Sequence, residues 1–140
     1  MTPFRLLLRV RYGECDAQQV VFNARYGDYV DVAATEFYRA VFGSYQALLE
    51  QGLDSQVVRM VTDWSAPARF DDVLQLEVRT LRLGNSSFTL VIEGVCGGQT
   101  RIRCLQVRVF AALDRLRGIP IPAELRRKMA RFALPDPAAE

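Results

Sequence analysis

The residue types in this sequence that could act as acids, bases or nucleophiles are aspartate, glutamate, cysteine and tyrosine, because the 140 residues include no histidine. The lack of histidine excludes a Ser-His-Asp triad, a Cys-His dyad and a histidine-ligated zinc site. Any acid–base step must therefore use carboxylates, tyrosines, cysteines or backbone groups.

Two carboxylates lie close together near the N-terminus, in the segment RYGECD. Asp16 precedes a helical stretch, where an aspartate is usually a cap or turn residue and, less often, a catalytic base. Glu14 either pairs with Asp16 or makes a structural hydrogen bond or salt bridge, and we favour the structural role. Cys15, between them, is expected to be a small buried side chain, since no histidine is present to activate its thiol.

Composition limits the other possibilities. The net charge of +2, from 18 basic and 16 acidic residues, is not that of a dedicated nucleic-acid binder. The three cysteines form no CxxC pair, which favours reduced thiols and a cytoplasmic location. No cluster of metal ligands is visible, so neither a metal nor another cofactor is predicted. The apolar run at the N-terminus is interrupted by arginines and is not expected to span or enter a membrane.

The first part of the chain predicts a strand followed by a long helix. Apolar residues alternate with arginines from Phe4 to Tyr12, which is the period of a strand. Asn23 is a favourable N-cap for a helix over residues 24–42, which is apolar around most of its circumference and therefore buried. On its polar stripe, Asp28 and Asp31 are expected to be solvated or paired with arginine. Gly43 ends this helix.

Four strands are predicted after a short link that could be helical (45–50). They span residues 57–70, 73–83, 86–96 and 100–112, with turns at Gly84-Asn85 and Gly97-Gly98. Pro67 suggests an edge or a bulge in the first of these strands. The alternation also slips near Thr80 and near Cys104-Leu105, which suggests bulges or strong curvature. A last helix is predicted over 123–132.

Long consecutive strands joined by tight turns form one antiparallel sheet, and that sheet must cover the buried helix. The predicted class is α+β, with about five strands wrapped around one central helix in a single domain, residues 1–134. The tail, 135–140, is predicted to be disordered. A chain this short can bury one core but cannot enclose a site between two domains. A fully walled site would need a second subunit.

The sequence RYGECDAQQVVFNARY resembles the opening motif of the 4-hydroxybenzoyl-CoA thioesterase-like family, whose fold is the hotdog fold. In that family an acid, a small residue, an aspartate, a short turn and two apolar residues lead into the central helix. PARFDDVLQLEV, LGNSSF and IPIPAELRRKM are similar to later parts of the family pattern. The resemblance covers residues 4–132.

The resemblance implies an acyl-CoA thioesterase in which Asp16 is the catalytic carboxylate, as general base or as nucleophile. The backbone amide that polarises the thioester carbonyl maps near Asn23. Val21, Phe22 and Tyr26 would line the substrate pocket. The family's pockets lie between subunits, which implies a homodimer or homotetramer that binds acyl-CoA.

Ser86 and Ser87, beside the hairpin turn, either bind the pantetheine or phosphates of CoA or are simple turn residues. The run Arg126–Arg131 is either a solvated helix face or a phosphate site. The sequence departs from the family at Gln18 and Gln19, where a glycine is common. Since glutamine adopts a positive φ less readily than glycine, this turn is expected to differ or to narrow the pocket.

The reaction suits a site without histidine. A thiol has a pKa of about 8.5, so the thiolate leaves without a strong general acid. One carboxylate and the free N–H groups of a helix N-terminus can supply the rest. A hotdog dehydratase would use histidine and is disfavoured. The alternative that stays open is a non-catalytic acyl-CoA-binding module, and the acyl group cannot be deduced from the sequence.

Overall fold

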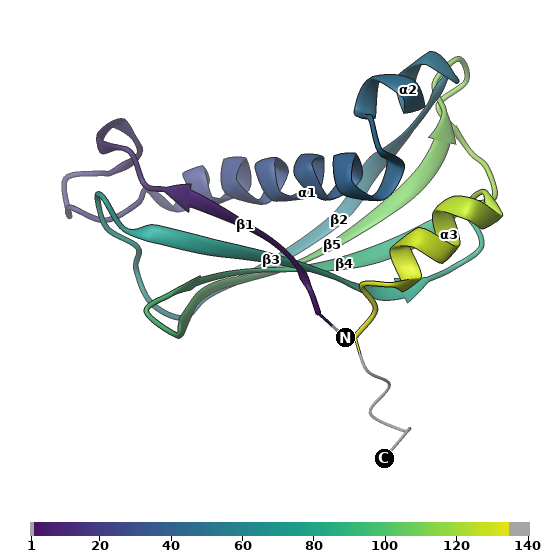
Figure 1. The fold of residues 1–140 in the computed structure, drawn as a ribbon. Coiled ribbons are helices and arrows are strands. Elements are labelled where there is room, and N and C mark those ends of the chain that lie inside the picture. The colour runs from purple at the N-terminus through teal and green to yellow at the C-terminus, as the bar shows by residue number, and fades with distance from the viewer. Residues whose placement is uncertain (1, 135–140) are drawn as a thin grey trace.

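A curled antiparallel sheet and one long helix make up most of the protein (Figure 1). The computed structural model describes residues 2–134. The strands are β1 (Phe4–Arg9), β2 (Leu53–Trp64), β3 (Val73–Leu83), β4 (Ser87–Cys96), β5 (Gln99–Ala112) and β6 (Arg117–Gly118). The helices are α1 (Tyr26–Phe42), α2 (Tyr45–Glu50) and α3 (Ala123–Ala130), with 3₁₀ turns η1 (Tyr12–Glu14) and η2 (Asn23–Arg25).

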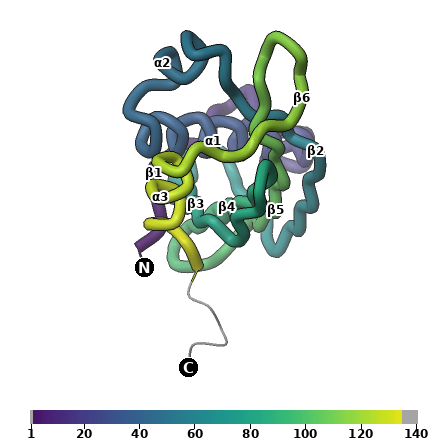
Figure 2. Tube along the Cα trace, turned by 90° about the vertical axis from the view of Figure 1, so that its right-hand side faces the viewer, coloured from purple at the N-terminus to yellow at the C-terminus, as the bar shows by residue number. Residues whose placement is uncertain are grey.

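The sheet has the order β1-β3-β4-β5-β2, and all neighbouring strands are antiparallel. The short β6, which was not predicted, pairs with the last residues of β5. Seen along its axis in Figure 2, α1 lies in the bend of the sheet, with β1 on one side and β2 on the other. The predicted α+β architecture, a sheet wrapped around a central helix, is confirmed.

Packing against α1 explains why the strands form where they do. On β3, Leu74, Leu76 and Val78 alternate with polar residues and are buried, as expected for a strand with one covered face. From α1, Phe37 makes edge-to-face contacts with Phe4 and Phe132, at 6.0 and 5.3 Å between ring centroids. The helix thereby joins β1 to the C-terminal segment.

Several predicted boundaries were wrong. β1 ends at Arg9, and Tyr12 is 81% exposed in the turn η1, because the chain leaves the sheet to enter the next loop. β2 spans Leu53–Trp64 and not 57–70, so Pro67 lies after the strand. β2 is nevertheless an edge strand, paired only with β5. At the β3–β4 hairpin, Gly84 does not take a positive φ, unlike Gly97 and Gly98 in the next turn.

The predicted bulge near Thr80 is confirmed by a register shift, whereas at Cys104-Leu105 itself the register is unbroken, and the nearest shifts lie at Val57/Arg59 of β2 and Gly94/Val95 of β4. Around that point β5 pairs regularly with both neighbours. The apparent slip arises because Gln106 and Arg108 are polar and yet buried, on the same face as Cys104 and Phe110. Two buried polar residues imitate a change of face in the hydrophobic pattern.

Different loops and helices lie at the two ends of the sheet (Figure 1). The loop between β1 and α1 lies at one end, together with the β4–β5 turn. The β3–β4 hairpin, α2 and α3 lie at the other.

Candidate active site

The segment between β1 and α1 folds back on itself. The Glu14 carbonyl accepts the N–H of Phe22 at 2.9 Å, and the Asp16 N–H donates to the Val20 carbonyl, also at 2.9 Å. Cys15 lies between these two bonds and forms a bridge with Val21. This narrow hairpin places Asp16 at the start of its tip.

The tip is a tight turn closed by Asp16 itself. Its carboxylate Oδ1 accepts the N–H of Gln18 at 2.8 Å, and its carbonyl accepts the N–H of Gln19 at 2.9 Å. Gln19 has a φ of 64°. The turn thus takes the left-handed backbone that suits glycine but builds it with glutamine, at a cost of about 1–2 kcal/mol. The replacement of glycine by glutamine therefore does not change the turn by excluding a positive φ at Gln19.

Asp16 borders a hollow of about 330 Å³ that is also lined by Tyr12, Cys15, Gln19 and Phe70. The rings of Tyr12 and Phe70 meet edge to face at 5.7 Å and form an aromatic wall. Within the described residues, Oδ2 of Asp16 makes no hydrogen bond, so one carboxylate oxygen is available to a water molecule or a substrate.

Glu14 has the structural role that the sequence favoured. Its Oε1 accepts the Arg11 N–H at 2.7 Å and the Tyr29 hydroxyl at 3.0 Å, while Oε2 forms an ion pair with the Arg11 guanidinium at 3.0 Å. Burial alone would raise the pKa of Glu14, but these hydrogen bonds and the Arg11 charge lower it below its ordinary value. The same burial and the Glu14 carboxylate raise the pKa of Tyr29. Glu14 is thus an ionised acceptor facing a neutral hydroxyl donor.

Asn23 does not cap the helix with its side chain, which corrects the prediction. Phe22 takes the extended cap conformation, φ −60° and ψ 133°, and Asn23 is already inside the turn η2. Because Asn23 and Ala24 begin the helical segment, their N–H groups have no intrahelical partner. Neither donates a hydrogen bond to another described residue. Asn23 borders a second hollow, about 290 Å³, with Trp64 and Tyr26.

Comparison with known proteins identifies the family. The family model described as "Thioesterase-like superfamily" matches residues 10–129. The chain belongs to this family. An acyl-CoA thioester hydrolase of Escherichia coli O6:H1 is 35% identical over 103 residues, which are 66% of this chain and 77% of that protein. The 4-hydroxybenzoyl-CoA thioesterase of Pseudomonas sp. strain CBS-3 is 28% identical over 126 residues, 83% of this chain and 89% of that one. The predicted enzyme class, a thioester hydrolase, is confirmed with the family.

Solved structures of thioesterases confirm the hotdog fold. A thioesterase superfamily protein from Jannaschia sp. CCS1 superimposes with a TM-score of 0.88 at 23% identity, over 95% of this chain and 94% of that one. A gentisyl-coenzyme A thioesterase superimposes with a TM-score of 0.81 at 24% identity, over 91% and 99% of the two chains. The sheet curled around α1 is therefore the architecture of this family.

The other residues predicted to bind substrate divide between the two ends of the molecule. Val21 and Tyr26 border the Asn23 hollow but are themselves buried, and the Tyr26 hydroxyl accepts the Ala68 N–H at 3.1 Å. Phe22, 47% exposed, can contact a ligand. Ser86 and Ser87 lie at the opposite end of the sheet, beside the β3–β4 hairpin, so one protomer does not bring them to Asp16.

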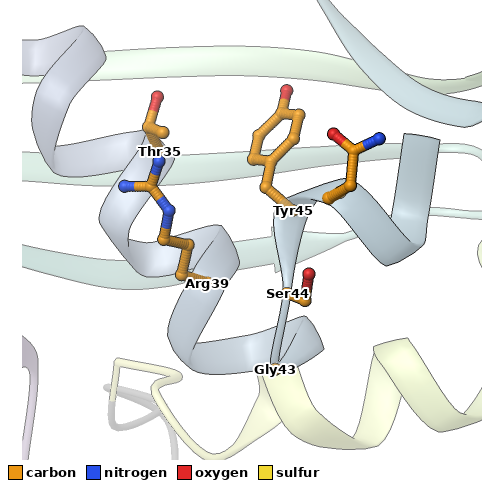
Figure 3. Close-up of a pocket in the computed structure, with 6 residues that line it drawn as sticks. Thr35, Arg39, Gly43, Ser44 and Tyr45 are labelled. Carbon is orange, nitrogen blue, oxygen red and sulfur yellow. The ribbon is translucent and has the colours of Figure 1, made fainter. Parts of the chain in front are cut away.

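A further hollow, about 430 Å³, lies between the C-terminal turns of α1 and the start of α2. Figure 3 shows its lining: Thr35, Arg39, Gly43, Ser44, Tyr45 and Gln46. Arg39 is paired with Glu36, and the lining contains no carboxylate or thiol. This hollow therefore does not have the chemistry of a thioesterase site.

Two other charged groups that the sequence offered, Asp28 and Arg126, have partners within the protein. Asp28 pairs with Arg25 at 3.4 Å, as the sequence suggested. The Arg126 guanidinium donates to the carbonyl of Gly84 at 2.6 Å. This side chain therefore holds the β3–β4 hairpin turn and is only partly solvated. Among the described residues, no group of three metal-binding side chains comes together and no helix is long and apolar enough to cross a membrane.

Proposed function

We propose that this protein hydrolyses the thioester of an acyl-coenzyme A to the free acid and CoA, with Asp16 as the catalytic carboxylate. The observation that carries the proposal is the position of Asp16, on a loop tip that leads directly into the N-terminus of α1, with one carboxylate oxygen available. Relatives named acyl-CoA thioester hydrolase and 4-hydroxybenzoyl-CoA thioesterase support the substrate class.

The chemistry needs few groups. In one route, Asp16 removes a proton from a water molecule while that water attacks the carbonyl carbon. In the other, Asp16 itself attacks the carbon and forms a mixed anhydride, which water then hydrolyses. In both routes the C–S bond breaks and the electron pair leaves with the thiolate. The N–H groups of Asn23 and Ala24, at the positive end of the helix dipole, can stabilise the oxyanion.

A second copy of the chain completes the proposed site. Asp16 and Asn23 border separate hollows in one protomer, and the Asn23 hollow opens beside Trp64 at the end of β2. β2 exposes Val57, Val58, Met60, Val61 and Trp64 along an edge with no partner strand among the described residues. An edge of this kind is suited to pair with another strand.

Pairing of β2 with its own copy about a two-fold axis makes the two strands antiparallel. The end of the sheet that carries Asp16 and Asn23 in one protomer then coincides with the end that carries Ser86 and Ser87 in the other. This arrangement supports a homodimer in which both predicted regions serve one bound acyl-CoA. A homotetramer would add a second such dimer.

The interface has a matched test. Val58→Arg places a charge at the most exposed apolar position of β2, whereas Leu7→Arg does so on the opposite edge strand, β1, where Leu7 is 69% exposed. We expect light scattering to show a monomer with little activity for Val58→Arg and an active dimer or tetramer for Leu7→Arg. A fully active monomer contradicts the shared site.

Thiol release from a panel of aromatic, short-chain and long-chain acyl-CoAs, without added metal, tests the activity itself. Binding of these esters without turnover would replace the proposal by the alternative, a non-catalytic acyl-CoA-binding module. For an active enzyme, acid quenching during turnover distinguishes the two routes. An acyl group on the peptide that contains Asp16, or ¹⁸O from labelled water in the Asp16 carboxylate after a single turnover, identifies a nucleophile, while the lack of both supports a general base.

A further inference from the structure

Glu14 is the one carboxylate that is buried among residues 2–134, with 7% of its surface exposed. It lies two residues before Asp16 and is not itself directed into the hollow that Asp16 borders. A buried carboxylate is costly unless it is paired and hydrogen-bonded, so its contacts indicate what the fold uses it for.

Those contacts join three separate segments. Through Arg11, the carboxylate holds the chain as it leaves β1, with bonds to both the backbone N–H and the guanidinium. Through the Tyr29 hydroxyl, at 3.0 Å, it holds the first turn of α1. Its own carbonyl accepts the Phe22 N–H at 2.9 Å, one residue before Asn23. The two arms of the loop and the helix therefore meet at Glu14.

We propose that Glu14 and Tyr29 are positioning residues for thioester hydrolysis. They fix the loop against α1 so that the Asp16 carboxylate and the N–H groups of Asn23 and Ala24 keep one relative placement around the thioester. This inference rests on the proposed role of Asp16. A small displacement of a reacting group is enough to slow a step strongly, because the reaction depends on close and oriented approach.

The chain contains a matched control at the other end of α1. There the Tyr45 hydroxyl donates to the Asp54 carboxylate at 2.7 and 2.9 Å, which is also a tyrosine–carboxylate bond, partly buried where the Tyr29–Glu14 bond is buried. Burial and the carboxylate raise the pKa of Tyr45, as they do for Tyr29. Tyr29→Phe and Tyr45→Phe thus remove the same atom from the same kind of bond, near to and far from the loop.

Kinetics with acyl-CoA separate positioning from general stability. We expect Tyr29→Phe and Glu14→Gln each to lower kcat by about tenfold with KM changed less than threefold, because binding contacts remain while alignment is lost. The double variant should be little worse than Tyr29→Phe alone, since Glu14→Gln weakens the same charge-assisted contact that Tyr29→Phe removes. Tyr45→Phe should keep kcat within twofold. Equal kcat values for Tyr29→Phe and Tyr45→Phe, at similar losses of thermal stability, would overturn the proposal.

Amide hydrogen exchange gives a readout that does not need activity. Tyr29→Phe should speed exchange at Asp16 and Phe22, whose N–H groups close the loop, whereas Tyr45→Phe should leave both unchanged. If Tyr29→Phe and Glu14→Gln leave loop exchange as in the wild type, the pair does not position the loop. If the loop loosens but the wild type hydrolyses no acyl-CoA, the proposed function fails while the role of the pair in holding the loop stands.

Discussion

The two ends of α1 use similar groups in opposite ways. At its C-terminal end, Gly43 takes a positive φ of 78°, and Ser44 caps α2 by accepting the Ala47 N–H at 3.2 Å. Tyr38 is buried, with its hydroxyl bonded to Ser55 and its ring stacked on Tyr45. At the N-terminal end, Gln19 occupies the positive φ, no side chain caps the helix, and the first N–H groups stay unpaired among the described residues.

This difference suggests that the C-terminal end of α1 contributes mainly to the stability of the fold and the N-terminal end to the proposed reaction. The C-terminal end satisfies its polar groups and places glycine where the backbone requires it, as expected of a structural terminus. Within residues 2–134, the N-terminal end keeps N–H donors and a carboxylate oxygen without partners, and a glutamine at a positive φ. Strained backbone and unpaired polar groups cluster at functional sites, so these features support the role proposed for this end. Variants at the two ends should therefore affect different properties.

The largest effect is expected from Asp16→Asn. It keeps the shape and the turn-forming oxygen but removes the charge that either mechanism needs, so kcat should fall by about 10²-fold or more. Thiol release measures the change. Asp28→Asn and Asp31→Asn, on the exposed stripe of α1, are the controls and should cost little. Near-normal activity of Asp16→Asn together with an inactive control would mean that the catalytic carboxylate is misassigned.

Tyr38→Phe probes the C-terminal end. The change removes a buried hydroxyl that bonds Ser55 and lies 3.4 Å from Arg108, leaving those groups less well satisfied. We expect the free energy of unfolding to fall by about 1–3 kcal/mol in a denaturant titration, with kcat per folded molecule within twofold. A loss of kcat without a loss of stability would show that this end also serves catalysis.

Gln19→Gly and Gly43→Ala should change the stability of the fold in opposite directions. Glycine at position 19 removes the left-handed strain and should stabilise the fold by up to about 1 kcal/mol, whereas alanine at position 43 introduces it and should cost about 1 kcal/mol. Thermal unfolding measures both. Stabilisation by Gln19→Gly at the expense of kcat would indicate that glutamine holds the catalytic turn, and destabilisation would contradict the strain assigned to it.

The smallest effect concerns pH. The folded protein lowers the pKa of Glu14 below the ordinary value of 4.5. Ionised Glu14 therefore stabilises the fold at pH values above 4.5, and this contribution is lost as pH falls through the lowered pKa. The wild type should unfold at a higher temperature than Glu14→Gln at pH 7, and the gap should narrow below pH 4. A gap that widens in acid would reverse the sign of the assigned shift.

The regular parts of the fold could be predicted because their patterns are local. Leu74, Leu76 and Val78 alternate without interruption, and β3 was predicted with its observed bounds. Prediction failed where tertiary contacts override the pattern. Arg108 is buried, and its guanidinium donates to Gln106 on the same strand and to Tyr38 of α1. Because the partner on α1 is far away in the sequence, the local pattern could not predict the burial of this arginine. The two residues of β6 carry no strand signal at all.

The candidate site shows the same division. A resemblance to a family motif pointed to Asp16, whose catalytic role stays a prediction. The structural role expected for Glu14 is confirmed by its bonds to Arg11 and Tyr29. The bond from Tyr29 spans fifteen residues and depends on how the loop meets α1. A helical tyrosine facing inward was visible, but its partner was not. Asn23 was misjudged because its residue type favours capping, while the chain placed Phe22 at the cap.

In the homodimer proposed above, a newly synthesised copy of this protein would expose β2, an edge of twelve residues with exposed valine, methionine and tryptophan side chains, until it met a second copy. During that interval the same edge can pair with any other exposed strand, including those of misfolded chains. Assembly then competes with aggregation, and the outcome depends on concentration and on time. The quality of a preparation of this enzyme should consequently depend more on how quickly copies find each other than on the stability of the single domain.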